Sequence, residues 1–121
     1  MSPQVLRTTR LLAKETVQWE AFNGLDGTGS PAYLTATDLS AHVVEYDGSK
    51  GHEYLVDAAG TQVRIPVVLF VDGDTASVPT EQDRITIDST RVFTVFQKTT
   101  VHGLTYTRAT PDHFKFALRA E

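Results

Sequence analysis

Val63-Arg64-Ile65-Pro66-Val67-Val68-Leu69-Phe70-Val71 is the stretch of this sequence that decides the fold. Two further apolar segments follow it: residues 84–87, after an acidic, turn-rich loop at 72–83, and residues 92–96, four residues later. All three are rich in β-branched and aromatic residues, and runs of this length suit a pleated, half-buried surface. The sequence therefore predicts a compact antiparallel core around residues 63–96.

The side chains of residues 63–71 divide between two faces of the expected strand. All the odd-numbered residues are apolar and share one face, whereas the other face is apolar only at Val68 and Phe70. We expect that part of this second face is covered, by a neighbouring subunit or by the N-terminal arm. Pro66 lacks an amide proton, so the strand is expected to lie at an edge or to be bulged there.

Apolar residues predict four more short strands around this core, at residues 17–22, 39–46, 104–107 and 113–118. Six or seven short strands at this spacing indicate an all-β fold, and we expect a small antiparallel β-barrel. Trp19 is the only tryptophan, and burial is the usual fate of so large a side chain, so it is expected to anchor the core.

The 121 residues are expected to form one domain, with an N-terminal arm at 1–16, a barrel at 17–121 and a long excursion at 46–62. The chain has no cysteine, which excludes disulfides and thiolate chemistry. It has no apolar run of membrane-spanning length and no signal-like segment, so a soluble cytoplasmic protein is expected. The net charge of -4 disfavours a sequence-reading DNA-binding domain, which usually carries a basic face.

The N-terminal arm and two loops are the candidate interaction surfaces, and the two loops supply the named residues. A loop as long as residues 46–62 in so small a domain is more often functional than a simple connection. The acidic loop at 72–83 is the second candidate. Together they supply the candidate interaction residues, which are Tyr46, Asp47, Lys50, His52, Glu53, Tyr54, Asp72, Asp74 and Glu81.

The sequence contains no convincing catalytic, cofactor or metal motif. The four histidines lack the local spacing of a metal site, and no glycine-flanked nucleophile is present. The glycine-rich turn at 23–31 lacks the Lys-Ser/Thr that completes a phosphate-binding loop. The carboxylates of the 72–83 loop lack the ligand alternation of a calcium hand, so a solvated turn is expected there. We therefore predict no enzymatic activity, cofactor or metal.

Only one set of residues suggests a nucleic-acid surface. Binding of single strands on a barrel needs aromatic side chains interleaved with basic ones. The nearest approach to that pattern combines three aromatic residues with three basic ones, Phe93, Phe96, Tyr106, Arg91, Lys98 and Arg108. Packing in the core explains the phenylalanines at least as well.

The order and spacing of seven features, taken together, resemble the head-closure proteins of long-tailed bacteriophages, also called stopper or head-tail connector proteins. The similarity runs from residue 17 to residue 118. It is carried by the strand with Trp19, the turn Asp26-Gly27-Thr28-Gly29, the strand end Val43-Val44-Glu45, the excursion end Asp57-Ala58-Ala59-Gly60, the strand at 67–71, the segment Asp83-Arg84-Ile85-Thr86-Ile87 and the final strand at 113–118. The sequence departs from the usual pattern in having Gln82 and Asp88-Ser89-Thr90 where that family commonly has glycine.

The resemblance implies a structural virion protein that forms a homo-oligomeric ring in the phage neck. Such a ring closes the portal channel after DNA packaging and provides the surface for tail attachment. The implied partners are portal or adaptor proteins, tail terminator or tail tube proteins, and packaged DNA held without sequence recognition. The implied location is the virion neck, reached from the host cytoplasm, with no membrane contact.

Two alternatives to a stopper ring remain open at this point. One is another neck component, such as a tail terminator, because length and β content do not separate the two. The other is a small nucleic-acid-binding β-barrel, which would bind short DNA with an affinity that falls steeply with salt.

Overall fold

The structure is a computed structural model that describes residues 14–46, 53–102 and 111–120. These residues contain ten strands and no helix, so none of their segments is a helix able to cross a membrane. The strands are β1 (Glu15–Glu20), β2 (Phe22–Leu25), β3 (Pro31–Tyr33), β4 (Thr37–Glu45), β5 (Glu53–Val56), β6 (Gln62–Ile65), β7 (Val67–Asp72), β8 (Arg84–Ile87), β9 (Arg91–Val101) and β10 (His113–Ala120).

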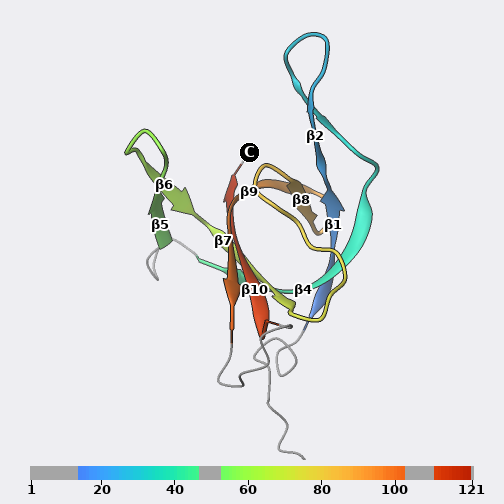
Figure 1. Ribbon diagram of the computed structural model, residues 1–121, viewed down its shortest axis with the longest axis vertical. Coiled ribbons are helices and arrows are strands. Elements are labelled where there is room, and N and C mark those ends of the chain that lie inside the picture. Colours follow the sequence, from blue (N-terminus) through green and yellow to red (C-terminus); the bar gives the residue numbers. More distant parts are fainter. Residues whose placement is uncertain (1–13, 47–52, 103–110, 121) are drawn as a thin grey trace, which may run out of the picture.

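Six of the strands close into an antiparallel barrel in the order β1-β4-β7-β10-β9-β8, and β8 pairs with β1 to complete the circle (Figure 1). The prediction of a small all-β barrel is therefore confirmed. The remaining strands form two separate hairpins, β2–β3 and β5–β6. Closure leaves the barrel without exposed strand edges, so the only free edges among the described strands belong to the hairpins.

The barrel interior is filled by alternate residues from all six of its strands, as the period of two requires. The interior cluster consists of Val17, Leu39, Ala41, Val67, Leu69, Val71, Ile85, Ile87, Phe93, Val95, Phe116 and Leu118. Trp19 is half-buried and packs against this cluster, in agreement with its predicted role as a core anchor.

The predicted strand at 63–71 is in fact two strands that belong to different sheets. It breaks at Pro66, which has no amide to donate to a ladder, and whose carbonyl accepts a hydrogen bond from the Tyr46 amide at 2.9 Å. The break changes which residues share a face. Val67 lies in the barrel interior, whereas Ile65 joins a second cluster outside it.

This second cluster covers the outer face of β7 and β10. Val68 and Ala117 are its buried residues on the barrel, and Leu55 and Val63 of the β5–β6 hairpin pack against them together with Phe96. The sequence correctly indicated that the face at Val68 is covered. Among the described residues, this cover comes from the chain's own second hairpin, β5–β6.

Other boundaries also differ from the predictions. β1 begins at Glu15 rather than at residue 17, and β9 continues to Val101, through residues expected to form a connection. The excursion at 46–62 contains β5 and the start of β6 instead of loop alone. The predicted strand at 104–107 and most of the predicted N-terminal arm lie outside the described residues.

Candidate interaction surface

Two hairpins project from the same end of the barrel on opposite flanks (Figure 1). We call β2–β3 with its turn the first hairpin, and β5–β6 with its turn the second hairpin. The C-terminal end of β10 lies between them in this view. The starts of β1 and β10 and the end of β9 lie at the opposite end of the barrel.

The two hairpins end in the same kind of turn. In the first, the Asp26 carboxylate accepts hydrogen bonds from the Thr28 amide at 2.8 Å, the Thr28 hydroxyl at 2.7 Å and the Ser30 amide at 3.0 Å. In the second, the Asp57 carboxylate accepts from the Ala59 and Thr61 amides, both at 2.9 Å. Each aspartate therefore fixes the shape of its own turn.

The fourth residue of each turn is a glycine, and here the backbone requires one. Gly29 and Gly60 both have φ of 86°, in the left-handed region that glycine tolerates without strain. The two tips thus share the pattern Asp-x-x-Gly-Ser/Thr. This repeat is present in the sequence and is the available signal for two matched hairpins, but the sequence analysis did not compare the two turns.

Acid should loosen the tip of the first hairpin. Its hydrogen bonds, with that of the Thr28 hydroxyl the strongest cause, hold the pKa of the Asp26 carboxyl below its ordinary value of 3.8. Because the pKa is lower in the folded protein, the charged carboxylate stabilises the turn at pH values above the ordinary pKa. This stabilisation is lost as the pH falls through the pKa of the folded protein. We expect the Thr28 and Ser30 amide NMR signals to shift and lose exchange protection as the pH is lowered below the ordinary aspartate pKa. Asp26→Asn should abolish this titration; unchanged signals in the unsubstituted protein would contradict the assignment.

Asp83 joins the first hairpin to the barrel. Its side chain is the buried acidic group of the described residues, and it accepts three hydrogen bonds: from the Trp19 indole at 2.9 Å, the Phe22 amide at 2.8 Å and the Thr80 amide at 2.9 Å. Trp19 belongs to β1 of the barrel and Phe22 is the first residue of β2, so this carboxylate joins the barrel to the first hairpin. The expectation of a solvated turn throughout residues 72–83 is therefore wrong at Asp83.

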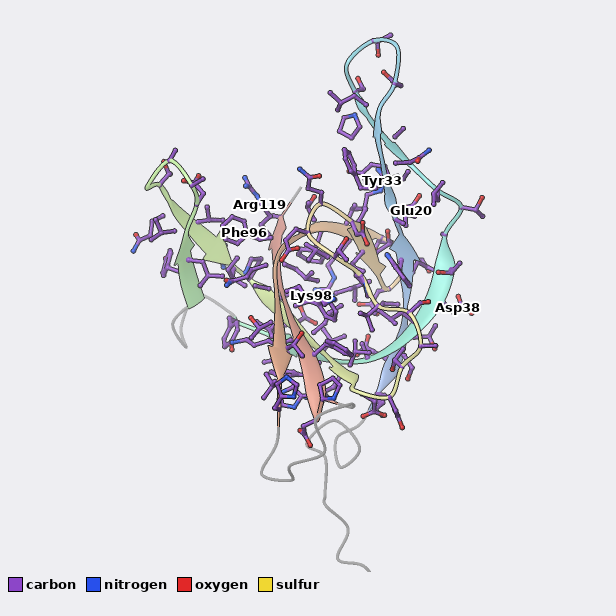
Figure 2. The ribbon with its side chains drawn as sticks, in the orientation of Figure 1. Glu20, Tyr33, Asp38, Phe96, Lys98 and Arg119 are labelled. Atoms are coloured by element: carbon purple, nitrogen blue, oxygen red, sulfur yellow. The ribbon has the colours of Figure 1, made fainter. Side chains whose placement is uncertain are left out.

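Arg84, the first residue of β8, contacts the same hairpin at its second strand, β3. Its guanidinium binds the Glu20 carboxylate through two hydrogen bonds, at 2.9 and 3.1 Å, and lies 4.0 Å from the centre of the Tyr33 ring. Figure 2 labels Glu20, the last residue of β1, and Tyr33 of the first hairpin. Tyr33 in turn packs edge-on against Phe22 at 6.0 Å. The two hydrogen bonds from Glu20 and the contact with the Tyr33 ring hold the Arg84 guanidinium in one orientation. Arg84 therefore helps to fix the direction in which the first hairpin leaves the barrel.

The second hairpin has one buried face and one exposed face. Leu55 and Val63 face the barrel, whereas Tyr54, paired with Arg64 across the ladder, faces solvent together with Val56. The side chains of Tyr54 and Val56 are 48% and 64% exposed.

The first hairpin carries a comparable exposed apolar pair. Leu25 of β2 is 66% exposed, and Leu34, directly after β3, is 52% exposed. These two residues, with Tyr54 and Val56, are the large exposed apolar side chains of the described residues. All four lie on or beside the projecting hairpins, so the apolar surface is concentrated where a partner can reach it.

The residues predicted for the excursion are only partly brought together. Tyr54 lies on the exposed face of the second hairpin, whereas Tyr46 is half-buried in the cluster beneath it. Glu53 belongs to β5, and its side chain is not described; Asp47, Lys50 and His52 lie outside the described residues.

The residues predicted in the acidic loop separate from one another. Asp72 forms an ion pair with Lys14, and Glu81 accepts a hydrogen bond from the Lys98 amide at 2.9 Å, while Asp74 is exposed. Their carboxylates therefore serve different local contacts. No three described histidine or acidic side chains are arranged to hold a metal ion.

Most of the aromatic and basic residues that could form a nucleic-acid-binding surface already make contacts within the chain. Phe93 lies in the barrel interior and Phe96 packs in the outer cluster. Arg91 is bound by Glu45 and by Asp88, and this contact lowers the pKa of the Glu45 carboxyl. Lys98 lies 5.3 Å from the centre of the Phe114 ring. Tyr106 and Arg108 lie outside the described residues.

The candidate surface residues that sequence reasoning missed are the exposed apolar side chains of the two hairpins, above all Leu25, Leu34 and Val56. Comparison with known proteins does not assign this surface. No protein-family model matches the chain, and no curated protein matches it.

Proposed function

We propose that this chain is a structural virion protein that forms a ring in the neck of a long-tailed bacteriophage. The ring closes the portal channel after DNA packaging and provides the surface to which the tail attaches. The proposal starts from the sequence resemblance over residues 17–118, and it assigns the chain no catalytic reaction.

The observation that carries the proposal is the presence of two different exposed apolar surfaces on opposite flanks of one rigid barrel. A closed ring is built from head-to-tail contacts, in which each subunit offers two different patches. Leu25 and Leu34 are exposed on or beside the first hairpin, and Tyr54 and Val56 are exposed on the second.

The remaining surfaces suit the other partners of a neck ring. The two ends of the barrel differ, since one carries both hairpins and the other does not (Figure 1). One end is available to the portal or adaptor and the other to the tail terminator or tail tube. The net charge of -4 suits a channel through which DNA passes without sticking, because acidic groups repel its phosphates.

Electron microscopy of lysates from the source phage, with this gene disrupted, tests the proposal. We expect complete tails that are separate from heads that have lost their DNA, and restoration of joined virions when the unsubstituted gene is supplied in trans. Tails of irregular length would instead identify a tail terminator, which limits tube growth. Normal virions would contradict any neck role, and salt-dependent DNA binding would then be the next measurement.

A further inference from the structure

Asn23 and Gly24 lie at a β-bulge in the first strand of the first hairpin. Two pairs of residues flank them on the ladder, Phe22 with Tyr33 and Leu25 with Pro31. Asn23 and Gly24 therefore stand opposite Ala32 alone, and a bulge of this kind leaves its extra residue out of the ladder. Gly24 has φ of 80°, in the left-handed region, and Asn23 is exposed to solvent.

An asparagine followed by a glycine is the pair that most readily loses ammonia without a catalyst. The backbone nitrogen of the glycine gives up its proton to solvent base and attacks the side-chain carbonyl carbon of the asparagine, since no Cβ on the glycine obstructs the approach. A carbon–nitrogen bond forms and closes a succinimide ring, while the side-chain nitrogen takes up a proton and leaves as ammonia. Water then opens the ring at either carbonyl, which yields aspartate or isoaspartate.

The structure leaves the reacting groups of this pair accessible. Within residues 14–46, 53–102 and 111–120, no hydrogen bond holds the Asn23 side chain. A Cβ built on Gly24 meets nothing within 4 Å, so the space around the glycine is open as well. The Asn23 side chain is therefore free to turn toward the Gly24 nitrogen, and water can reach the ring that forms.

Two aspartate–glycine pairs lie among the described residues, and their contacts oppose the same reaction. In the first, at the tip of the first hairpin, the Asp26 carboxylate is held by three hydrogen bonds within its own turn. In the second, the Gly73 amide already donates to the Asp112 carbonyl at 3.2 Å, and the Asp72 carboxylate forms an ion pair. An ionised carboxylate also reacts more slowly than an amide, because its negative charge repels the attacking nitrogen.

We propose that Asn23-Gly24 is a site of spontaneous modification, at which solvent water converts Asn23 through a succinimide to aspartate and isoaspartate. Either product adds a carboxylate to an uncharged strand, and isoaspartate also lengthens the main chain by one carbon inside the bulge. The preceding residue, Phe22, donates its amide to Asp83, so the change falls where the first hairpin joins the barrel. The inference stands on this chain alone and does not depend on a role in the phage neck.

Mass spectrometry of the folded, full-length chain tests the proposal. Asn23 is the only asparagine of the sequence, so early loss of a side-chain amide points to this position, and peptide mapping assigns it. Labelling by an L-isoaspartyl methyltransferase detects the isoaspartate. During incubation for several days at physiological temperature and mildly alkaline pH, we expect the peptide with Asn23 to lose most of its unmodified form and to become the main labelled peptide. The rate should fall at mildly acidic pH, because the Gly24 amide must lose its proton.

Asn23→Gln is the matched control, since it keeps an exposed side-chain amide and leaves Gly24 in place. Its longer side chain would have to close a less favourable ring, so the change in mass and the labelling of this peptide should be absent over the same period. The urea-unfolded chain measures the reaction without the fold. Modification of the unfolded chain beside an unchanged Asn23 in the folded chain would show that the bulge protects this pair and would overturn the proposal. Isoaspartate that accumulates at Asp26 or Asp72 as fast as at Asn23 would overturn it as well.

Discussion

Replacing Asp83 by alanine is expected to lower the free energy of unfolding by about 4 kcal/mol, because three part-buried donors lose the buried carboxylate that accepts their hydrogen bonds. The Asp83 side chain accepts hydrogen bonds from the Trp19 indole, the Phe22 amide and the Thr80 amide, all within 2.9 Å. An unsatisfied buried donor costs about 1–3 kcal/mol, and water that enters the space left by the carboxylate recovers part of the sum. The lost contacts also release the first hairpin, since Phe22 is its first residue.

Urea denaturation monitored by tryptophan fluorescence is the appropriate measurement, because Trp19 is the only tryptophan and its indole binds this carboxylate. Asp83→Asn keeps one oxygen acceptor and should cost less than alanine. Asp88→Asn is the matched control: its carboxylate is 61% exposed and pairs with Arg91, so its loss should cost less than about 1 kcal/mol. A loss below that for Asp83→Ala would refute the role given to this side chain.

The barrel could be predicted because the apolar pattern that marks each strand lies within a short stretch of sequence. Alternating apolar residues identify the strands that face the interior, and Phe114, Phe116 and Leu118 do share one side of β10 as their spacing indicated. The break at Pro66 could not be located in the same way. Whether a proline ends a strand or bulges it depends on the partner strands, and those come from distant parts of the chain.

The apolar hairpin faces could not be predicted for a related reason. Leu55 and Val56 are neighbours of similar character, yet Leu55 packs on the barrel and Val56 is exposed. Only the docking of the second hairpin against β7 and β10 distinguishes them. Exposure of a particular apolar residue is a tertiary property, and no periodicity in a four-residue strand reveals it.

Three residues that replace expected glycines illustrate how backbone geometry and sequence pattern are linked. Gln82 has φ of 79°, and Asp88 and Ser89 have φ of 56° and 62°. The Thr90 amide donates to the Ile87 carbonyl at 3.2 Å, so Asp88 and Ser89 form the centre of a tight hairpin turn of the kind that prefers glycine. Glycine adopts left-handed φ values without strain, so each of these three non-glycine residues carries a conformational cost that glycine would not.

Among the described glycines, Gly73 is the position where an added methyl group would clash most severely with its neighbours. A Cβ added there would lie 2.6 Å from the carbonyl carbon of Pro111, closer still to its oxygen, and 3.0 Å from the carbonyl carbon of Asp112. Both neighbours are backbone atoms, so no side chain can turn away to make room. The Gly73 amide also donates to the Asp112 carbonyl at 3.2 Å, which holds the start of β10 beside the end of β7.

Gly73→Ala is therefore expected to lower the free energy of unfolding by about 3 kcal/mol or more, because the segment before β10 must move and the β7–β10 pairing begins at that point. Urea denaturation measures the loss, and amide exchange at His113 and Phe114 locates it. Gly27→Ala is the matched control: its added Cβ meets nothing within 4 Å and its φ lies outside the left-handed region. That substitution should leave stability unchanged or raise it by up to about 1 kcal/mol through the unfolded state. Equal effects of the two substitutions would mean that Gly73 is needed for its flexibility and not for the close approach of the strand before His113.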